Sequence, residues 1–253
     1  MTRRCWIADE VHDNIACLTG EHAFHLSRVL RAQVGQEFDI STSDSVRRGT
    51  IISILPERVE FALGDEMIVK APPTLTLVLA IFKFDRMEWA LEKCTEVGVA
   101  RIIPVVARRT DAHLAAAARK RHERWLRILR QASEQSRRVS PPEISLPIKL
   151  RELGKDGIVP APAAMGGGPA GAKSQRVSRV VLAESEMNAS LRDVLPSCSD
   201  DAVLAVGPEG GWADDEMSWF GEEGWAAASL GNTILRAETA AIVATALAMD
   251  ALR

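Results

Sequence analysis

The sequence predicts an α/β protein built from two domains. Its apolar run from Leu75 to Phe82 is typical of a strand buried on both faces of a parallel sheet. After this run, strand-like and helix-like segments alternate, which indicates layers of helices on a sheet. Before it, short β-like runs dominate, and Pro72 and Pro73 cannot donate amide hydrogens to a continuing strand. We therefore expect one domain over residues 1–72 and a second over residues 73–253.

The first domain is predicted to be mainly β, with one helix. Strand-like runs separated by polar turns extend from Gln36 to Ser41, from Val46 to Leu55 and from Arg58 to Leu63. Between Glu21 and Arg31 the apolar residues recur at steps of three and four, which is typical of an amphipathic helix. The apolar stripe expected on this helix consists of Phe24, Leu26, Val29 and Leu30.

The second domain is predicted to alternate between strands and helices. The strands expected after Leu75 to Phe82 are residues 101–107, 177–183, 202–206 and 226–230. The expected helices are residues 85–97, 116–138, 214–223 and 237–252. Residues 157–175 are rich in Gly, Ala and Pro and predict a flexible loop. Core packing is the expected role of Trp89 and Trp125.

Charge is distributed unevenly along the chain. The net charge is -3 overall, but residues 71–150 hold 15 basic and 8 acidic residues, whereas residues 151–253 hold 8 basic and 15 acidic ones. A basic segment within an acidic protein indicates a polyanionic partner such as a nucleic acid.

Several protein classes are excluded by composition. No apolar stretch approaches the roughly 20 residues that a membrane-spanning helix needs, and the first residues lack the apolar core of a secretory signal. The cysteines do not form a C-x-x-C pair, so we expect neither a disulfide framework nor a zinc site, and buried thiols instead. His22 and His25 have no evident third ligand, so no metal is expected. These observations predict a cytoplasmic protein that is not associated with a membrane.

Two glycine-containing segments follow strands and precede helices. The first, GPEGG at 207–211, stands between an apolar strand and the acidic start of a helix. The second, SLGNTILRAETA at 229–240, has the same order, and Asn232 or Thr233 is a candidate helix cap. Ligands of α/β sheets bind beyond the carboxyl ends of strands, where glycines allow close approach to the backbone. A tight turn remains the alternative for the first segment.

A third glycine segment is interpreted differently. GGGPAG at 166–171 satisfies the G-x-G-x-x-G spacing, but a Pro-Ala-Pro stretch precedes it and Pro169 interrupts it. The dinucleotide motif requires a preceding strand and a following helix, so we interpret this segment as loop.

Five segments in order resemble the bacterial 16S ribosomal RNA uridine N3-methyltransferase family of the SPOUT class. They are HLSRVLRAQVGQ at 25–36, RMEWALEKCTEVGVARIIPV at 86–105, EQSRR at 134–138, GPEGG and SLGNTILRAETA. The chain departs from the family pattern after Arg138, where Val139 and Ser140 stand in place of an Asn and a basic residue.

The resemblance implies a fold, a cofactor and an assembly. It implies a PUA-like β-barrel RNA-binding domain at 1–72, then a SPOUT methyltransferase domain at 73–253 with a C-terminal trefoil knot, working as a homodimer. It also implies S-adenosylmethionine as cofactor. The residues implied to bind it are Leu182, Ala183, Glu184, Gly207, Pro208, Glu209, Gly210, Gly211, Leu230, Gly231, Asn232, Ile234, Leu235, Arg236, Thr239 and Ala240.

The implied reaction is methylation of N3 of a uridine in 16S rRNA of the small ribosomal subunit. Arg236 is the expected catalytic group, because a guanidinium can stabilise charge that develops on the uracil oxygens, and Glu238 is expected to orient it. Glu209 is a candidate either for the proton acceptor or for a buried role binding loop amides. The RNA is expected to contact His25, Arg28, Arg31, Arg86, Arg137 and Arg138.

Two alternatives stay open at this point. A non-catalytic RNA-binding ribosome assembly factor could keep this fold without turnover. A SPOUT methyltransferase acting on another RNA would share all the segments quoted above.

Overall fold

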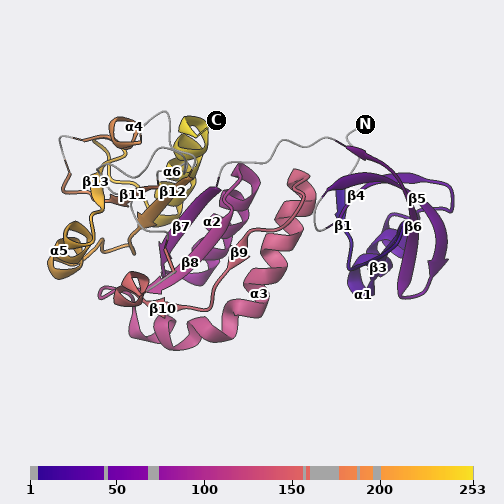
Figure 1. The fold of residues 1–253 in the computed structure, drawn as a ribbon. Helices are drawn as coiled ribbons and strands as arrows, with labels where there is room; N and C mark the ends of the chain where they lie inside the picture. The colour runs from indigo at the N-terminus through magenta and orange to yellow at the C-terminus, as the bar shows by residue number, and fades with distance from the viewer. Residues whose placement is uncertain are drawn as a thin grey trace. The chain divides into compact units, whose positions relative to one another are not determined.

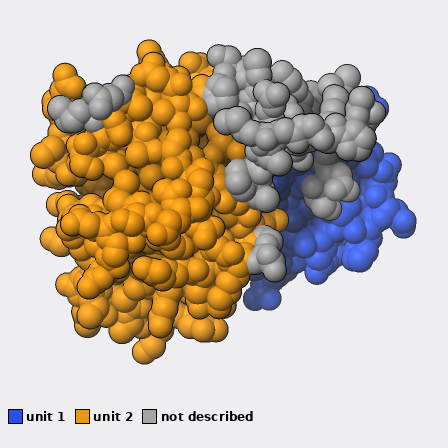
Figure 2. Space-filling view, turned by 60° about the vertical axis from the view of Figure 1, so that its left-hand side comes forward, with its two compact units in different colours: residues 1–71, 130–141 blue, residues 72–129, 142–253 orange. Residues whose placement is uncertain are grey.

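The computed structural model describes residues 5–42, 45–67, 74–155, 158–159, 177–186, 189–195 and 201–252. The chain divides into two compact units, coloured separately in Figure 2. Unit 1 comprises residues 1–71 and 130–141, and unit 2 comprises residues 72–129 and 142–253. Each unit carries its own β-sheet (Figure 1).

Unit 1 contains a six-stranded half-barrel sheet in the order β1-β4-β5-β6-β3-β2. Its strands are β1 (Cys5–Ile7), β2 (Glu10–His12), β3 (Ile15–Thr19), β4 (Glu37–Ser41), β5 (Val46–Leu55) and β6 (Arg58–Met67). Strand β1 pairs with β4 in parallel, and the other pairs are antiparallel. The expected strands β4, β5 and β6 are confirmed. The core beneath the sheet includes the fully buried rings of Trp6 and Phe61.

The helical segment of unit 1 differs from the expected amphipathic helix. One turn of α-helix, α1 (Gly20–Phe24), continues as the π-helix η1 (His25–Val29), in which the amide of Leu30 donates to the carbonyl of His25. The wider π turn changes which side chains share a face. Leu26 is buried as expected, but the expected stripe is wrong for the other three positions. The side chains left exposed are Phe24 at 55%, Val29 at 58% and Leu30 at 47%.

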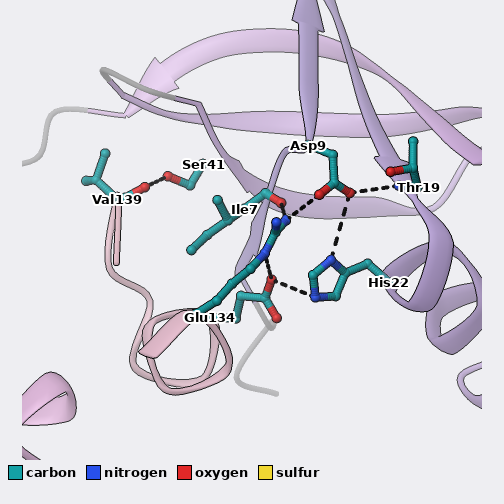
Figure 3. A network of polar contacts seen from close by, with 8 residues as sticks. Ile7, Asp9, Thr19, His22, Ser41, Glu134 and Val139 are labelled. Carbon is teal, nitrogen blue, oxygen red and sulfur yellow. Dashed lines mark hydrogen bonds and ion pairs between the residues drawn. The ribbon is translucent and has the colours of Figure 1, made fainter. Parts of the chain in front are cut away.

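A polar cluster joins residues 130–141 to the first strands of unit 1 (Figure 3). One guanidinium nitrogen of Arg130 lies 2.8 Å from Asp9 and donates to the carbonyl of Ile7 at 2.7 Å. His22 lies between two carboxylates, 3.8 Å from Asp9 and 3.5 Å from the fully buried Glu134. The Ser41 hydroxyl donates to the carbonyl of Val139. Because of these contacts, unit 1 includes a segment that the expected domain of residues 1–72 leaves out.

Unit 2 is built on an all-parallel sheet in the order β10-β8-β7-β12-β11-β13, with β9 paired to β8. Its strands are β7 (Thr74–Ala80), β8 (Arg101–Val106), β9 (Glu143–Ile144), β10 (Ile148–Lys149), β11 (Val177–Leu182), β12 (Asp201–Val206) and β13 (Ala226–Ala228). The helical segments are α2 (Phe84–Val97), α3 (Ala112–Ser136), the 3-10 helix η2 (Leu150–Gly154), α4 (Leu191–Val194), α5 (Asp214–Glu222) and α6 (Ala237–Ala251). Every strand and helix expected in the second domain is present, with small shifts at the ends.

Both faces of this sheet are covered by apolar side chains. Along β7, Leu75, Leu77 and Leu79 contribute to one core cluster, whereas Val78 and Ala80 contribute to the other. Alternate residues of a strand point to opposite faces, so β7 is buried on both sides. This confirms the interpretation of its continuous apolar run.

Three further expectations can be compared with the structure. Trp125 is fully buried as expected, but Trp89 is 48% exposed, because α2 buries the face that carries Met87, Ala90 and Leu91 instead. Cys5, Cys17 and Cys94 are buried free thiols, and burial raises the pKa of Cys94 to about 12. Cys198 lies outside the described residues.

Of the loop expected at 157–175, only residues 158 and 159 are described, and they form a turn and a bend. Val159 is buried, and the carbonyl of Ile158 accepts a hydrogen bond from Arg101 at 2.9 Å. Residues 160–175, which include the GGGPAG segment, lie outside the described residues. Within the described part of the chain, none of the helices has the length and apolar character needed to cross a membrane.

Candidate functional site

The carboxyl ends of five parallel strands meet at one edge of the unit 2 sheet. The segments that follow them are Lys83 to Arg86 after β7, Arg108 and Arg109 after β8, Leu182 to Ser185 after β11, Gly207 to Trp212 after β12, and Ser229 to Arg236 after β13. Parallel pairing places all these ends on the same side, which is where ligands of α/β sheets bind.

A cleft of about 720 Å³ opens at this edge, a volume within the ordinary range of small-molecule sites. The expected cofactor-binding residues that line it are Leu182, Ala183, Glu184, Gly207, Pro208, Glu209, Gly210, Gly211, Leu230, Gly231, Asn232, Ile234, Leu235, Arg236 and Ala240. Thr239, which belongs to the same expected set, does not line the cleft. The structure therefore brings three separate loops into one site.

Glycines in the cleft are required by backbone geometry and by close packing. Gly211 has φ +69° and Gly231 has φ +116°, a region that other residues rarely adopt. A Cβ atom on Gly207 would lie 3.3 Å from Nε1 of Trp212. That indole nitrogen is buried and has no hydrogen-bond partner among the described residues. A site that leaves a buried donor unpaired is suited to a ligand with a hydrogen-bond acceptor.

Two arginines that sequence analysis did not select follow β8, and one of them holds the first glycine loop while the other holds the start of α5. Arg109 lines the cleft and donates to the carbonyl of Gly210 at 2.7 Å. The amide of Arg108 donates to the buried carboxylate of Glu216 at 2.7 Å, and its guanidinium pairs with Asp215 at the same distance. The sequence could have indicated these two residues, because two adjacent arginines directly follow a predicted strand. Their role depends on β8 ending at the same edge as β12.

The two expected catalytic residues are placed differently. Arg236 is exposed in the cleft, directly before α6, and its guanidinium makes no hydrogen bond or ion pair with other described residues. The helix therefore begins after Arg236, and neither Asn232 nor Thr233 caps it. Glu238 is buried and does not line the cleft.

Glu238 is paired with a different arginine from the one expected. Its Oε1 lies 3.8 Å from Nε of Arg86, whereas its Oε2 has no hydrogen-bond partner among the described residues. The expectation that Glu238 orients Arg236 is therefore wrong. Arg86, which we expected to contact RNA, lines the cleft.

Glu209 is less buried than one of its two expected roles requires. Its side chain is exposed and accepts a hydrogen bond from the amide of Lys83 at 3.5 Å. It therefore contacts a loop amide as expected, but it is not buried.

The remaining residues expected to bind RNA belong to unit 1. Arg28, Arg31 and Arg137 are exposed, and His25 and Arg28 line a second pocket of about 590 Å³. Arg138 is partly buried, and this burial lowers the pKa of its guanidinium. Among the residues that the structure describes, no group of three or more His, Cys, Asp or Glu side chains is arranged to hold a metal ion.

Comparison with known proteins supports an assignment. Residues 69–249 match a family model described as an RNA methyltransferase domain. Ribosomal RNA small subunit methyltransferase E of a Synechocystis species is 28% identical, over 94% of this chain and 74% of the relative. The protein of the same name from Rickettsia conorii is 28% identical, over 96% of this chain and 93% of the relative.

Solved structures show the same similarity. A ribosomal RNA small subunit methyltransferase E from Neisseria gonorrhoeae, bound to S-adenosylmethionine, has a TM-score of 0.79 and 26% identity over 97% of this chain and 96% of that one. A protein from Legionella pneumophila in complex with the same cofactor has a TM-score of 0.81 and 26% identity, over 99% of this chain and 98% of that one. The chain belongs to the RNA methyltransferase domain family and, within it, to the group of ribosomal RNA small subunit methyltransferase E.

Proposed function

We propose that the chain uses S-adenosylmethionine to methylate N3 of a uridine in 16S rRNA of the small ribosomal subunit. This proposal rests on one observation: the loops that follow β11, β12 and β13 line a single cleft, in a chain of this family. The similar structures from N. gonorrhoeae and L. pneumophila are bound to this cofactor. Action on ribosomal RNA would place the protein in the cytoplasm.

The residues of the cleft fit this cofactor. The glycine loops allow a ligand to approach the backbone, and Trp212 offers a buried donor without a partner among the described residues. Arg109 would keep the loop at Gly210 in place through its hydrogen bond to the carbonyl. When bound, S-adenosylmethionine supplies a methyl group activated by its positively charged sulfur.

Arg236 is proposed as the residue that acts on the uracil. The N3 position is an imide nitrogen, which becomes a good nucleophile only when its proton leaves and charge spreads to O2 and O4. The guanidinium of Arg236 is exposed in the cleft and has no competing partner among the described residues, so its donors are available for those oxygens. Arg86, held beside Glu238, is proposed to contribute further positive charge to the same cleft.

The remaining features of the proposal come from the family resemblance. We propose that residues 1–72 act as a PUA-like RNA-binding domain, in which His25, Arg28 and Arg31 contact the RNA, together with Arg137 from the segment 130–141 of the same unit. Residues 73–253 would form the SPOUT methyltransferase domain, with a C-terminal trefoil knot, and the active species would be a homodimer. The mass of the protein in solution, measured by light scattering, tests the last statement.

The proposal is tested by methyl transfer from labelled S-adenosylmethionine to unmodified small ribosomal subunits and, separately, to free 16S rRNA. Mass spectrometry of the digested RNA identifies the modified base. The expected product is N3-methyluridine. Methylation of a different RNA would favour another SPOUT activity, and failure of both cofactor binding and transfer would favour a non-catalytic RNA-binding protein.

A further inference from the structure

The pocket of about 590 Å³ in unit 1 has two walls of different origin. One wall is the helical segment α1 and η1, which contributes Gly20, Glu21, Phe24, His25, Arg28 and Val29. The other is the turn between β5 and β6, which contributes Pro56 and Glu57. The amide of Gly20 donates to the carbonyl of Glu57 at 3.1 Å, which fixes the two walls to each other.

The apolar part of the pocket is exposed because of the π-helix. In an i to i+5 pattern Phe24 and Val29 lie one turn apart on the same side, and they are 55% and 58% exposed. An exposed aromatic ring beside a second exposed apolar side chain is typical of an interaction site, and π-helical turns occur frequently at functional sites.

The polar part of the pocket combines both signs of charge. Arg28 is exposed, and its guanidinium has no hydrogen bond or ion pair with other described residues. The carboxylates of Glu21 and Glu57 are exposed and likewise have no such partner in the described part of the chain. The ring of His25 packs against the buried ring of Trp6, with ring centroids 6.0 Å apart.

These groups together match one unpaired nucleotide. Aromatic side chains stack on unpaired bases, and arginine pairs with phosphate. Carboxylates accept hydrogen bonds from exocyclic amino groups, as they do from N4 of cytosine. Uracil has no amino group, and its one N3–H donor lies between two carbonyl oxygens that a carboxylate repels, so carboxylates favour cytosine over uracil.

We propose that this pocket binds a single unpaired base bearing an exocyclic amino group, such as cytosine, in the RNA substrate, stacked on Phe24 with its amino edge toward Glu57 or Glu21. The identity of the polymer rests on the proposed function. The nucleotide held here is therefore distinct from the uridine that is methylated.

The test measures fluorescence anisotropy of labelled single-stranded oligocytidylate and oligouridylate titrated with the full chain at fixed salt. We expect tighter binding of oligocytidylate. Phe24→Ala should weaken it by roughly ten- to a hundredfold, the range expected for loss of one stacked base, whereas Phe24→Trp should retain it. Val34→Ala is the matched control, because Val34 is apolar and 62% exposed but does not line the pocket.

A second variant measures base preference rather than affinity alone. Glu57→Gln replaces a pure acceptor with an amide that can also donate, so the preference for cytosine over uracil should shrink. Glu21→Gln tests the other carboxylate in the same way. Equal losses in Phe24→Ala and Val34→Ala, or a base preference unchanged in both glutamine variants, would overturn the proposal. The proposal would also be overturned if oligouridylate bound as tightly as oligocytidylate.

Parallel measurement of S-adenosylmethionine binding separates this inference from the proposed function. If methyl transfer occurs and Phe24→Ala leaves RNA affinity unchanged, only the base pocket is wrong. If the pocket variants behave as expected but the chain binds no S-adenosylmethionine, the methyltransferase proposal fails and the pocket stands.

Discussion

Nε of Arg86 lies 3.8 Å from Oε1 of Glu238, and this pair joins the start of α2 to the first turn of α6. Arg86 lines the cleft, whereas the carboxylate of Glu238 is buried behind it. A buried carboxylate needs a compensating charge. Arg86 therefore contributes positive charge to the cleft and also compensates the buried carboxylate of Glu238, which stabilises unit 2.

Removing Arg86 should destabilise the protein through the carboxylate left behind. We expect Arg86→Ala to lower the free energy of unfolding by about 1–3 kcal/mol, the usual cost of a buried polar group without its partner. The double variant Arg86→Ala with Glu238→Gln should recover much of that loss. Urea denaturation of the single and double variants measures the coupling, and strictly additive effects would contradict an interaction between the two side chains.

Arg236→Ala should slow methyl transfer while leaving S-adenosylmethionine affinity largely intact. Loss of one group that stabilises developing charge typically lowers kcat by about 10²–10³-fold. Single-turnover methylation and isothermal calorimetry measure the two quantities. Arg192→Ala is a suitable control, because Arg192 is exposed and lies outside the cleft. Unchanged turnover in the Arg236 variant would remove this residue from the catalytic role.

Gly210→Val should abolish cofactor binding. Gly210 lines the cleft, and a Cβ atom there would lie in ordinary contact with Arg109, 3.5 Å from its Cδ, so the two further methyl groups of valine would take up space beside that arginine and the cleft. Gly221→Val provides the comparison, since a Cβ atom there meets nothing within 4 Å. Wild-type affinity in the Gly210 variant would show that the cofactor does not use this loop.

The polar cluster of Figure 3 predicts a loss of stability in acid. Burial would raise the pKa of Asp9, but hydrogen bonds from His22 and the amide of Thr19, together with the charge of Arg130, hold the pKa at about 2. A depressed pKa stabilises the folded state above the ordinary value of about 4, and this contribution is lost as the pH falls toward 2.

Asp9→Asn should therefore cost on the order of 1 kcal/mol of unfolding free energy near pH 6, since solvent screens part of the interaction, and much less near pH 2. Urea titrations at several pH values test this. Asp65→Asn is the control, because Asp65 is exposed and has no hydrogen bond or ion pair with other described residues. The cluster would not be the source of the acid sensitivity if both variants had the same pH dependence.

The sequence predicted the features that depend on local pattern. The continuous apolar run of β7 and the glycines after β12 and β13 locate the cleft, because a strand followed by a glycine loop and a helix is visible without any knowledge of the sheet order. The start of α6 at Ala237 was also predictable, although its cap was not.

Features that depend on tertiary neighbours were not predictable. Arg109 reaches Gly210 only because β8 and β12 both flank β7, an order that the sequence does not contain. The pairing of Glu238 with Arg86 instead of Arg236 likewise follows from the packing of α2 against α6. The exposure of Phe24 and Val29 results from a switch in hydrogen bonding that the regular spacing of apolar residues does not reveal.

The continuation of α3 into unit 1 bears on how this protein can be divided. Asp9 and His22 find their partners Arg130 and Glu134 more than a hundred positions later in the chain. A fragment that stops after residue 72 would carry the six strands but lose Arg130 and Glu134, so Asp9 and His22 would keep only each other as charged partners. The N-terminal half-barrel is therefore not a portable module. Fusion proteins and chimaeras that exchange it with a relative must carry residues 130–141 along with it.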